Sequence, residues 1–226
     1  MVIIADKKIP DEALYRLKPY EKIILIETKD ITYSAISGHP DIFFCQADDV
    51  LIISSNLPVP VIDELKTEQI RFVFAENKTG NTYPATAGLN AGVTPDFIIH
   101  NENYTDPVLK RLCSAKQFVH VNQGYTRCNL IPLKNNRFIT SDKGIEKALK
   151  KHNLEVLYVD PKGILLPGFD HGFIGGTCGV FDDNIFFTGS LNRFPEGEKV
   201  RDFLDDHNII EVYDGPLFDG GSLIFV

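Results

Sequence analysis

The sequence predicts an α/β protein whose chain is divided into five similar units arranged in a ring, with strands lining the centre and helices outside. Three observations carry this prediction. An apolar segment of strand length recurs along the 226 residues, a helix-like pattern follows each copy, and a second strand-like segment follows each helix. The copies begin near residues 2, 50, 97, 137 and 185, with the sequences VIIADKKIP, VLIISSNLP, FIIHNENYTDP, RFITSDKG and IFFTGSLNRFP. Five such units fill residues 1–226 as one domain.

The helices are predicted from apolar residues at i, i+3, i+4 and i+7, which is the spacing of one helical face. Asp142 is a candidate N-cap, and Pro10 and Pro195 stand where a first helical turn tolerates a missing N–H. The pattern is formed by Val200, Phe203, Leu204 and His207 in the fifth unit, and by Ile145, Ala148, Leu149 and His152 in the fourth.

A second strand follows each helix, in the segments KIILI, IRFVF, QFVHV, LEVLYV and IIEVY. A strand, a helix of about ten residues and another strand indicate a parallel, right-handed crossover. A turn and a short third extended piece complete each unit. One such unit cannot bury both its helix and its sheet, whereas five units in a ring can.

Charge and composition limit the classes of partner that we expect for this chain. The net charge of −8 and the absence of a basic stripe argue against nucleic acid. No run of about 18 apolar residues is present, and Asp6 comes too early for a secretory segment, so we expect no membrane partner and a cytoplasmic location. The four cysteines are then expected to be reduced thiols. They form no CxxC, and no His pair has zinc-finger spacing, so we expect no metal site.

A glycine-rich stretch, GFDHGFIGGTCGV from Gly168 to Val180, raises the question of a phosphate site. It does not match GxGxxG, and it precedes a turn and a strand, whereas a dinucleotide fingerprint opens a helix. No GxxxxGK[ST] occurs, so we expect no nucleotide cofactor. Glycines at the centre of a ring would instead allow close approach of converging segments.

The chain resembles the pentein superfamily of guanidine-modifying enzymes, whose fold is a five-fold pseudo-symmetric α/β propeller. The resemblance covers the whole chain and depends on the five strand–helix–strand–strand repeats and on the phrases NQGYTRCNL, GFIGGTCGVF, NIFFTGSL and DGPLFDGGSLIFV. These phrases most resemble a bacterial branch that lacks the usual C-terminal catalytic cysteine. The superfamily includes amidinotransferases, arginine and agmatine deiminases, dimethylarginine hydrolases and a non-catalytic ribosome anti-association factor.

The resemblance implies a small-molecule ligand in a central channel, on the third pieces of the units. These pieces are GHPDIFF, AGLNAG, YTRCNLIPL, FIGGTCGVF and DGGSLIFV. The candidate inward-facing groups are therefore Asp41, Asn90, Cys128, Asn129, Asp170, His171, Cys178, Asp219 and Ser222. The alternative for each residue is that a short polar side chain satisfies a turn or a strand end.

Guanidine chemistry uses a cysteine thiolate, a histidine that moves protons, and carboxylates that hold the planar cation. The resemblance places the histidine at His171, with Asp170 to orient it or to contact a cation, and with Asp41 and Asp219 as further carboxylates. An alternative is that the Cys128 and Cys178 thiols bind a soft metal together with His171. The last segment, GGSLIFV, contains no cysteine, and its Ser222 would need a strong base because an alcohol titrates far above a thiol. Cys128 and Cys178 occupy corresponding third pieces and are alternative nucleophiles, or buried apolar residues like Cys45 and Cys113.

Three functions remain open at this point. The first is binding of a small polar or cationic molecule, of the guanidine or amine type, without the usual cysteine mechanism. The second is C–N hydrolysis or amidino transfer with Cys178 or Cys128 as nucleophile and His171 as acid and base. The third is a non-catalytic protein-interaction module. The sequence does not determine the oligomeric state.

Overall fold

The computed structural model describes residues 1–20 and 22–226, which contain five separate three-stranded sheets. In each sheet a central strand pairs with one antiparallel and one parallel neighbour. The central strands are β1 (Val2–Asp6), β4 (Val50–Ile53), β7 (Phe97–His100), β10 (Arg137–Thr140) and β13 (Asn184–Phe187). Their parallel partners are β2 (Lys22–Ile26), β5 (Phe72–Phe74), β8 (Gln117–His120), β11 (Glu155–Tyr158) and β14 (Asn208–Glu211). The five sheets fit the five predicted units.

The central strands are the most buried of the strands, which explains their continuous apolar sequences. Every residue of β1 and β4 is buried, whereas the parallel partners β5 and β14 contain no buried residue. A strand covered on both faces needs apolar side chains at successive positions rather than at alternate ones. Because these strands are continuous apolar runs, their starting positions could be predicted from the sequence.

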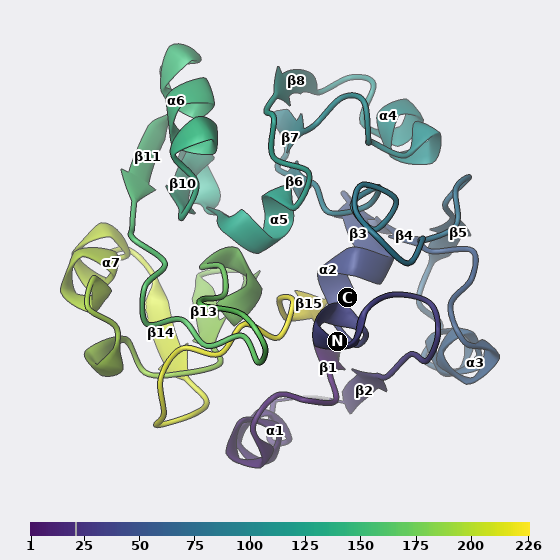
Figure 1. The fold of residues 1–226 in the computed structure, drawn as a ribbon, viewed down its shortest axis with the longest axis horizontal. Helices are drawn as coiled ribbons and strands as arrows, with labels where there is room; N and C mark the ends of the chain where they lie inside the picture. Colours follow the sequence, from purple (N-terminus) through teal and green to yellow (C-terminus); the bar gives the residue numbers. More distant parts are fainter. Residues whose placement is uncertain (21) are drawn as a thin grey trace.

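A helix connects each central strand to its parallel partner, as predicted. These helices are α1 (Asp11–Leu17), α3 (Val59–Thr67), α4 (Pro107–Leu112), α6 (Lys143–Lys151) and α7 (Gly197–Phe203), and they lie at the periphery in Figure 1. The N-cap prediction for Asp142 is confirmed, since its side chain accepts a 2.8 Å hydrogen bond from the backbone N–H of Ile145. Pro10 immediately precedes α1, and Pro195 lies two residues before α7.

The third pieces differ from the prediction in one respect. They supply the antiparallel strands β3 (Phe44–Ala47), β6 (Gly92–Val93), β9 (Leu130–Pro132), β12 (Cys178–Phe181) and β15 (Ile224–Phe225). Three of these strands are preceded by a helical turn: α2 (Pro40–Phe43), α5 (Thr126–Asn129) and η3 (Gly175–Thr177). The short turns η1 (Ser34–Ile36), η2 (Lys134–Asn136) and η4 (Leu191–Arg193) lie elsewhere. In Figure 1, α2, α5 and β15 lie in the interior of the molecule. The polar residues Asp41 of α2 and Asn129 of α5 are buried.

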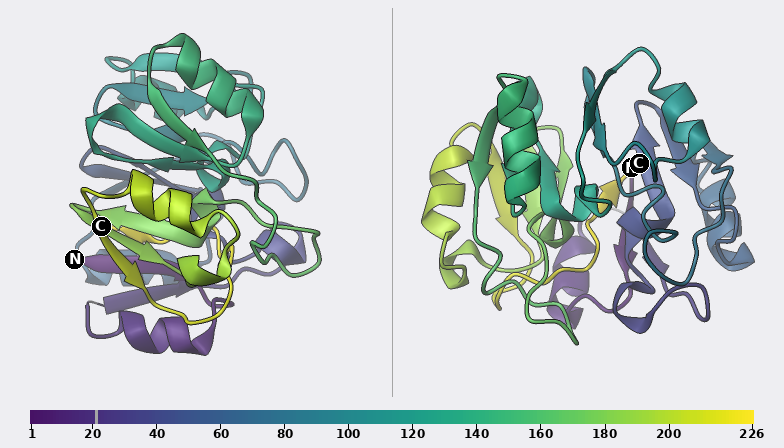
Figure 2. Two further views of the ribbon diagram at one scale, coloured as in Figure 1. Left: turned by 90° about the vertical axis from the view of Figure 1, so that its left-hand side faces the viewer. Right: turned by 45° about the horizontal axis from the view of Figure 1, so that its top comes forward.

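Each third piece pairs with the first strand of the following unit, because only a short turn separates the two. The last third piece supplies β15, which pairs with β1 of the first unit, with Ile3 opposite Phe225. The N–H of Val2 donates to the carbonyl of Val226 at 2.6 Å, and the two termini lie close together in both views of Figure 2. The first and last strands therefore share one sheet.

The antiparallel pairing gives the molecule two distinct ends. The carboxyl ends of the central strands lie beside the amino ends of the third pieces, and the short turns that follow the third pieces lie at the opposite end. No helix in the described part of the chain is both long enough and apolar enough to cross a membrane. The two ends hold the cavities described next.

Candidate functional site

Four polar side chains from different units meet in the interior and form what we call the axial cluster: Asp41, Asn90, Cys128 and Ser222. The Ser222 hydroxyl donates to Oδ2 of Asp41 at 2.7 Å, and the Cys128 thiol donates to the same oxygen at 3.1 Å. Asn90 donates from Nδ2 to the Cys128 sulfur at 3.0 Å and accepts the Cys128 N–H at 3.1 Å. All four residues are at most 4% exposed. These four are among the nine candidate inward-facing residues predicted from the sequence, and the structure brings them together.

The Asp41 carboxyl is only partly satisfied. Its Oδ2 has two donors, whereas its Oδ1 is buried and has no hydrogen-bond partner among the described residues. Burial raises the pKa of Asp41, and the Ser222 hydrogen bond and the Arg127 guanidinium oppose this rise. A buried carboxyl oxygen without a donor is unfavourable and marks a place where a ligand could bind.

A second group of buried titratable residues, Asp6, His39 and Asp219, lies on one side of the axial cluster. Nε2 of His39 is 3.9 Å from Oδ2 of Asp6, and its Nδ1 is 4.0 Å from Oδ1 of Asp219. Both distances are too long for hydrogen bonds, and Nδ1 has no partner among residues 1–20 and 22–226. The three residues line a cavity of about 400 Å³, which we call the acidic cavity.

The backbone around these residues is held close by glycine. A Cβ on Gly38 would collide with the Asp6 carboxyl, and one on Gly176 would collide with the Asp219 carboxyl. Asp219 cannot easily withdraw, because it accepts hydrogen bonds from the N–H groups of Phe173 at 2.8 Å and Gly221 at 3.1 Å. The glycine-rich stretch therefore allows converging segments to approach closely, as predicted.

Burial controls the protonation of the acidic cavity. It raises the pKa of Asp219 to about 7, with a further contribution from the negative charge of Asp41. It raises the pKa of Asp6 to about 6, although the backbone hydrogen bond from Lys8 opposes this change. Burial and the nearby Lys8 lower the pKa of His39 to about 3, so the imidazole is neutral at pH 7. The carboxyls thus change charge near neutral pH while the histidine does not.

The mouth of the acidic cavity is aromatic. Tyr33 and Phe169 line it, with ring centroids 6.3 Å apart and planes inclined at 45°. The hydroxyl of Tyr33 lies 3.2 Å from that of Tyr125, and Phe169 is 54% exposed. The Lys8 ammonium donates to the Ser37 hydroxyl at 2.7 Å and to the carbonyl of Ser34. Aromatic faces and carboxyls favour a cation, and Lys8 opposes one.

The other predicted site residues lie apart from this group. Asp170 and His171 are exposed on the loop before η3, and Nδ1 of His171 contacts the carbonyl of its neighbour Gly172 at 2.9 Å. Asn129 is buried, donates to the carbonyl of Tyr125 and accepts from the Ser141 hydroxyl. The structure therefore brings His171 to neither Cys128 nor Cys178, because its side chain is turned toward solvent.

The two thiols of the corresponding third pieces have different surroundings. Cys128 belongs to the axial cluster, whereas Cys178 packs in an apolar core with Ile131 and Phe187. Burial raises the pKa of Cys178 to about 12 and raises that of Cys128 well above its usual value. Both are protonated at neutral pH, which disfavours thiolate attack. Cys45 and Cys113 are buried in another apolar cluster, as predicted.

Sequence reasoning missed Asp6, His39 and Arg127. Asp6 ends the first apolar strand, and His39 stands two residues before the predicted Asp41 in GHPD, so both had a positional signal. Arg127 adjoins Cys128 and donates to the carbonyls of Leu130 at 3.0 Å and Gly175 at 2.9 Å. The part of the chain that the structure describes contains no group of three or more His, Cys, Asp or Glu residues arranged to hold a metal ion.

A family model covers almost the entire chain, matching residues 4–224. The chain belongs to DUF6873, a family of unknown function. No curated protein is significantly similar to it in sequence.

Solved structures show which fold this family member adopts. The C. jejuni agmatine deiminase superposes with a TM-score of 0.59 at 13% identity, over 96% of this chain and 90% of that one. An amidinotransferase from Microseira wollei in the saxitoxin biosynthetic pathway gives 0.56 at 11% identity, over 95% and 88%. A dimethylarginine dimethylaminohydrolase gives 0.56 at 10% identity, over 94% and 92%. These proteins are members of the pentein superfamily, so the resemblance seen in the sequence is confirmed at the level of fold.

Proposed function

We propose that the chain is a five-bladed, pseudo-symmetric α/β propeller whose acidic cavity binds a small organic cation of the guanidine or amine type. The observation that carries the proposal is the arrangement of Asp6, His39 and Asp219. Two buried carboxyls flank an imidazole that is hydrogen-bonded to neither of them. The pentein-fold structures that resemble the chain include proteins named for guanidino substrates, which supports the same ligand class.

The charges of the cavity favour a cation over other ligands. Ionised carboxylates inside a protein are unfavourable unless a positive charge or several donors compensate them. A guanidinium or ammonium group between Asp6 and Asp219 would supply both. Nearby, the neutral His39 can accept a hydrogen bond from the same group. The rings of Tyr33 and Phe169 at the mouth suit an apolar stem.

Protonation links this binding to pH. Since the pKa of Asp219 is raised to about 7 and that of Asp6 to about 6, these carboxyls carry a proton below those values. A bound cation favours the ionised form, so binding releases protons. We expect the affinity to rise as the pH increases from 5 to 8 and to level off above it.

Calorimetric titration with three probes of one shape tests the proposal: n-butylguanidine, n-butylamine and n-butanol. We expect heat from the two cations and none from the alcohol, with the guanidine bound more tightly because it donates in a planar fork. Asp219→Asn and Asp6→Asn should each weaken binding at least tenfold. Lys8→Gln should strengthen it by about threefold, since it removes a like charge.

The matched control is Asp63→Asn, which removes an exposed carboxylate from α3. It should bind the cations like the unaltered protein. Circular dichroism and urea unfolding establish that each variant is folded. Equal binding of butanol and butylguanidine, or unchanged affinity in both Asp219→Asn and Asp6→Asn, would refute the proposal.

A further inference from the structure

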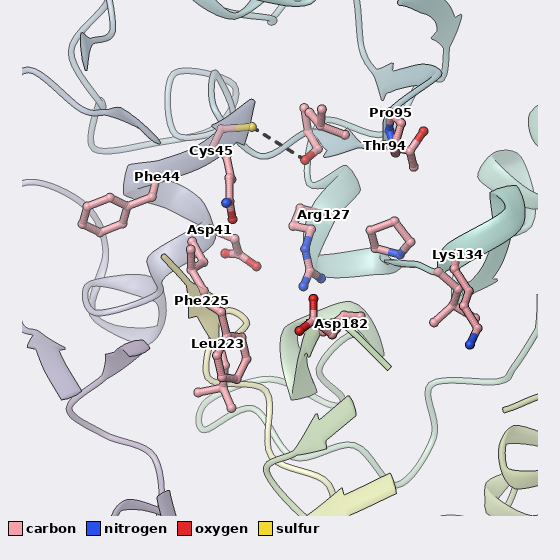
Figure 3. Close-up of a pocket in the computed structure, with 17 residues that line it drawn as sticks. Asp41, Phe44, Cys45, Thr94, Pro95, Arg127, Lys134, Asp182, Leu223 and Phe225 are labelled. Atoms are coloured by element: carbon pink, nitrogen blue, oxygen red, sulfur yellow. Dashed lines mark hydrogen bonds between the residues drawn. The ribbon is translucent and has the colours of Figure 1, made fainter. Parts of the chain in front are cut away.

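A second cavity, of about 470 Å³, lies at the end of the molecule opposite to the acidic cavity. It is lined by third-piece residues such as Phe44, Val93 and Phe225, together with Asp41 and Arg127. Figure 3 shows the Asp41 carboxyl from α2 to one side of the Arg127 guanidinium from α5, with the Asp182 carboxyl beside the end of the same guanidinium. We call this the Arg127 cavity.

The Asp41 carboxyl and the Arg127 guanidinium do not pair directly. Within residues 1–20 and 22–226 no ion pair joins them, and the guanidinium opposes the rise in the pKa of Asp41 that burial causes. The Arg127 Nη1 donates to the carbonyls of Leu130 and Gly175, and its Nη2 donates to that of Cys178 at 3.4 Å. Those backbone acceptors hold the guanidinium in place and keep it from reaching Asp41.

Both groups retain hydrogen-bonding capacity. A guanidinium has five N–H donors, and three carbonyls leave the Nε–H and one Nη2–H of Arg127 without an acceptor in the described part of the chain. Asp41 is 1% exposed and its Oδ1 has no donor. A ligand that satisfies both must therefore present an acceptor with negative charge and a donor with positive charge.

Asp182 and Lys134 also line the cavity, and the rest of its wall is mostly apolar, with Phe44, Val93, Leu223 and Phe225 exposing carbon surface to it. A site of this volume is in the range of small-molecule pockets. An ammonium and a carboxylate on one carbon, with an apolar side chain, match the two charges and the wall at the same time. We propose that the Arg127 cavity is a second site, which binds a free α-amino acid with an apolar side chain.

The assignment gives each group a role. The ligand carboxylate accepts from the free N–H groups of Arg127, and the ligand ammonium donates to Oδ1 of Asp41. The side chain lies against Val93 and Phe225. This site is separate from the acidic cavity, because the axial cluster lies between the two, and it does not depend on the function proposed there.

Two-dimensional ¹H–¹⁵N NMR of the full chain tests the inference with three probes: L-leucine, L-leucinamide and N-acetyl-L-leucine. The first carries both charges, the second only the positive charge and the third only the negative one. We expect leucine to shift the Arg127 Nε–H signal and the amide signals of Val93 and Thr94. The two single-charge probes should bind at least tenfold more weakly.

Asp41→Asn sharpens the test. Losing the carboxylate removes the ammonium partner, so the variant should lose its preference for leucine over N-acetyl-leucine. Should that variant fail to fold, the three-probe comparison on the unaltered chain still decides the matter. Three results would overturn the inference. One is equal shifts from all three probes, and another is shifts only at Tyr33 and His39. The third is no shift from leucine at 10 mM, roughly the weakest dissociation constant expected for amino-acid binding. Shifts at Tyr33 and His39 report on the acidic cavity, so failure here is distinguishable from failure of the proposed function.

Discussion

The acidic cavity and the Arg127 cavity lie at opposite ends of the same five inner segments, yet their charges differ. In the acidic cavity, two carboxyls with raised pKa values surround a neutral histidine. In the Arg127 cavity, the carboxyls of Asp41 and Asp182 lie with the permanent guanidinium of Arg127 and the Lys134 side chain. The charges of the two cavities differ because different residues lie at each end. Asp6, at the end of a central strand, lines the acidic cavity, whereas the cationic Arg127 of α5 lines the other one.

The two cavities show that one backbone fold can hold cavities of different charge at its two ends. The strands fix where side chains meet, and the residue at each strand end or helical turn decides the charge there. The axial cluster belongs to both sides, since Asp41 lines the Arg127 cavity while its charge raises the pKa of Asp219. The two ends are therefore separated in space and connected through one carboxyl.

The largest expected effect comes from adding a single methyl group beside the acidic cavity. Gly176→Ala places a Cβ against the Asp219 carboxyl, while the Gly176 carbonyl is held by the N–H groups of Gly220 at 3.1 Å and Ser222 at 2.9 Å. We expect the free energy of unfolding in urea to fall by about 3 kcal/mol or more.

The control substitution is made at the opposite end of the molecule, at Gly92 next to Val93 of the Arg127 cavity. Gly92→Ala meets only the tip of the Leu130 side chain as a close neighbour, and this tip can move. Its unfolding free energy should change by less than about 1 kcal/mol. Similar losses for both variants would mean that the acidic cavity is no more tightly packed than the other end.

The next effect is a dependence of stability on pH that comes from Asp6 in the acidic cavity. The pKa of Asp6 is about 6 in the folded protein and ordinarily 3.8, so the folded state holds this proton more tightly. The resulting stabilisation is complete below pH 3.8 and is lost as the pH rises to about 6. Urea unfolding of the unaltered protein and Asp6→Asn at a series of pH values measures it.

The difference in unfolding free energy between these two proteins should fall by roughly 2–3 kcal/mol between pH 4 and pH 7. Using the difference cancels the contribution of carboxylates that do not interact with Asp6, whereas Asp219 and Asp41 are coupled to it. Asp63→Asn, whose carboxylate is exposed, should show no such trend. A constant difference across this range would mean that Asp6 has an ordinary pKa.

The smallest effect distinguishes the axial cluster from the apolar core next to it. Cys128→Ser keeps a donor for Asp41 and an acceptor for Asn90, so we expect a loss of less than about 1 kcal/mol. Cys178→Ser places a hydroxyl among apolar side chains, and the loss should be about 2 kcal/mol. Thermal unfolding compares the two, and the reverse order would contradict the assignment of Cys128 to the polar cluster.

Much of the fold could be predicted from the sequence because its signals are local. Fully buried strands such as β1 and β4 read as continuous apolar runs, and the helix face of α6 reads as a periodic pattern with Asp142 before it. The helical turns α2 and α5 could not be predicted, since four residues are too few to show a helical period. Tertiary contacts alone determine their conformation.

The candidate site was predicted only in part, for a related reason. Asp41, Asn90, Cys128 and Ser222 stand out as polar residues within apolar or glycine-rich third pieces. His171 shares that appearance, but its side chain points to solvent, and nothing in its neighbours indicates the direction. The partners of a buried group come from distant units, so the meeting of His39 with Asp6 and Asp219 is visible only in three dimensions.

The pairing of β15 with β1 has a consequence for how the chain folds. The strand that covers one edge of β1 comes from a segment far away in the sequence, with Ile3 opposite Phe225 and Ile4 opposite Ile224. Until these distant segments meet, that edge of β1 exposes unpaired backbone groups, which can pair with the strands of other molecules. A partly folded chain that lacks this one pairing is therefore the species that is most prone to associate through a strand edge.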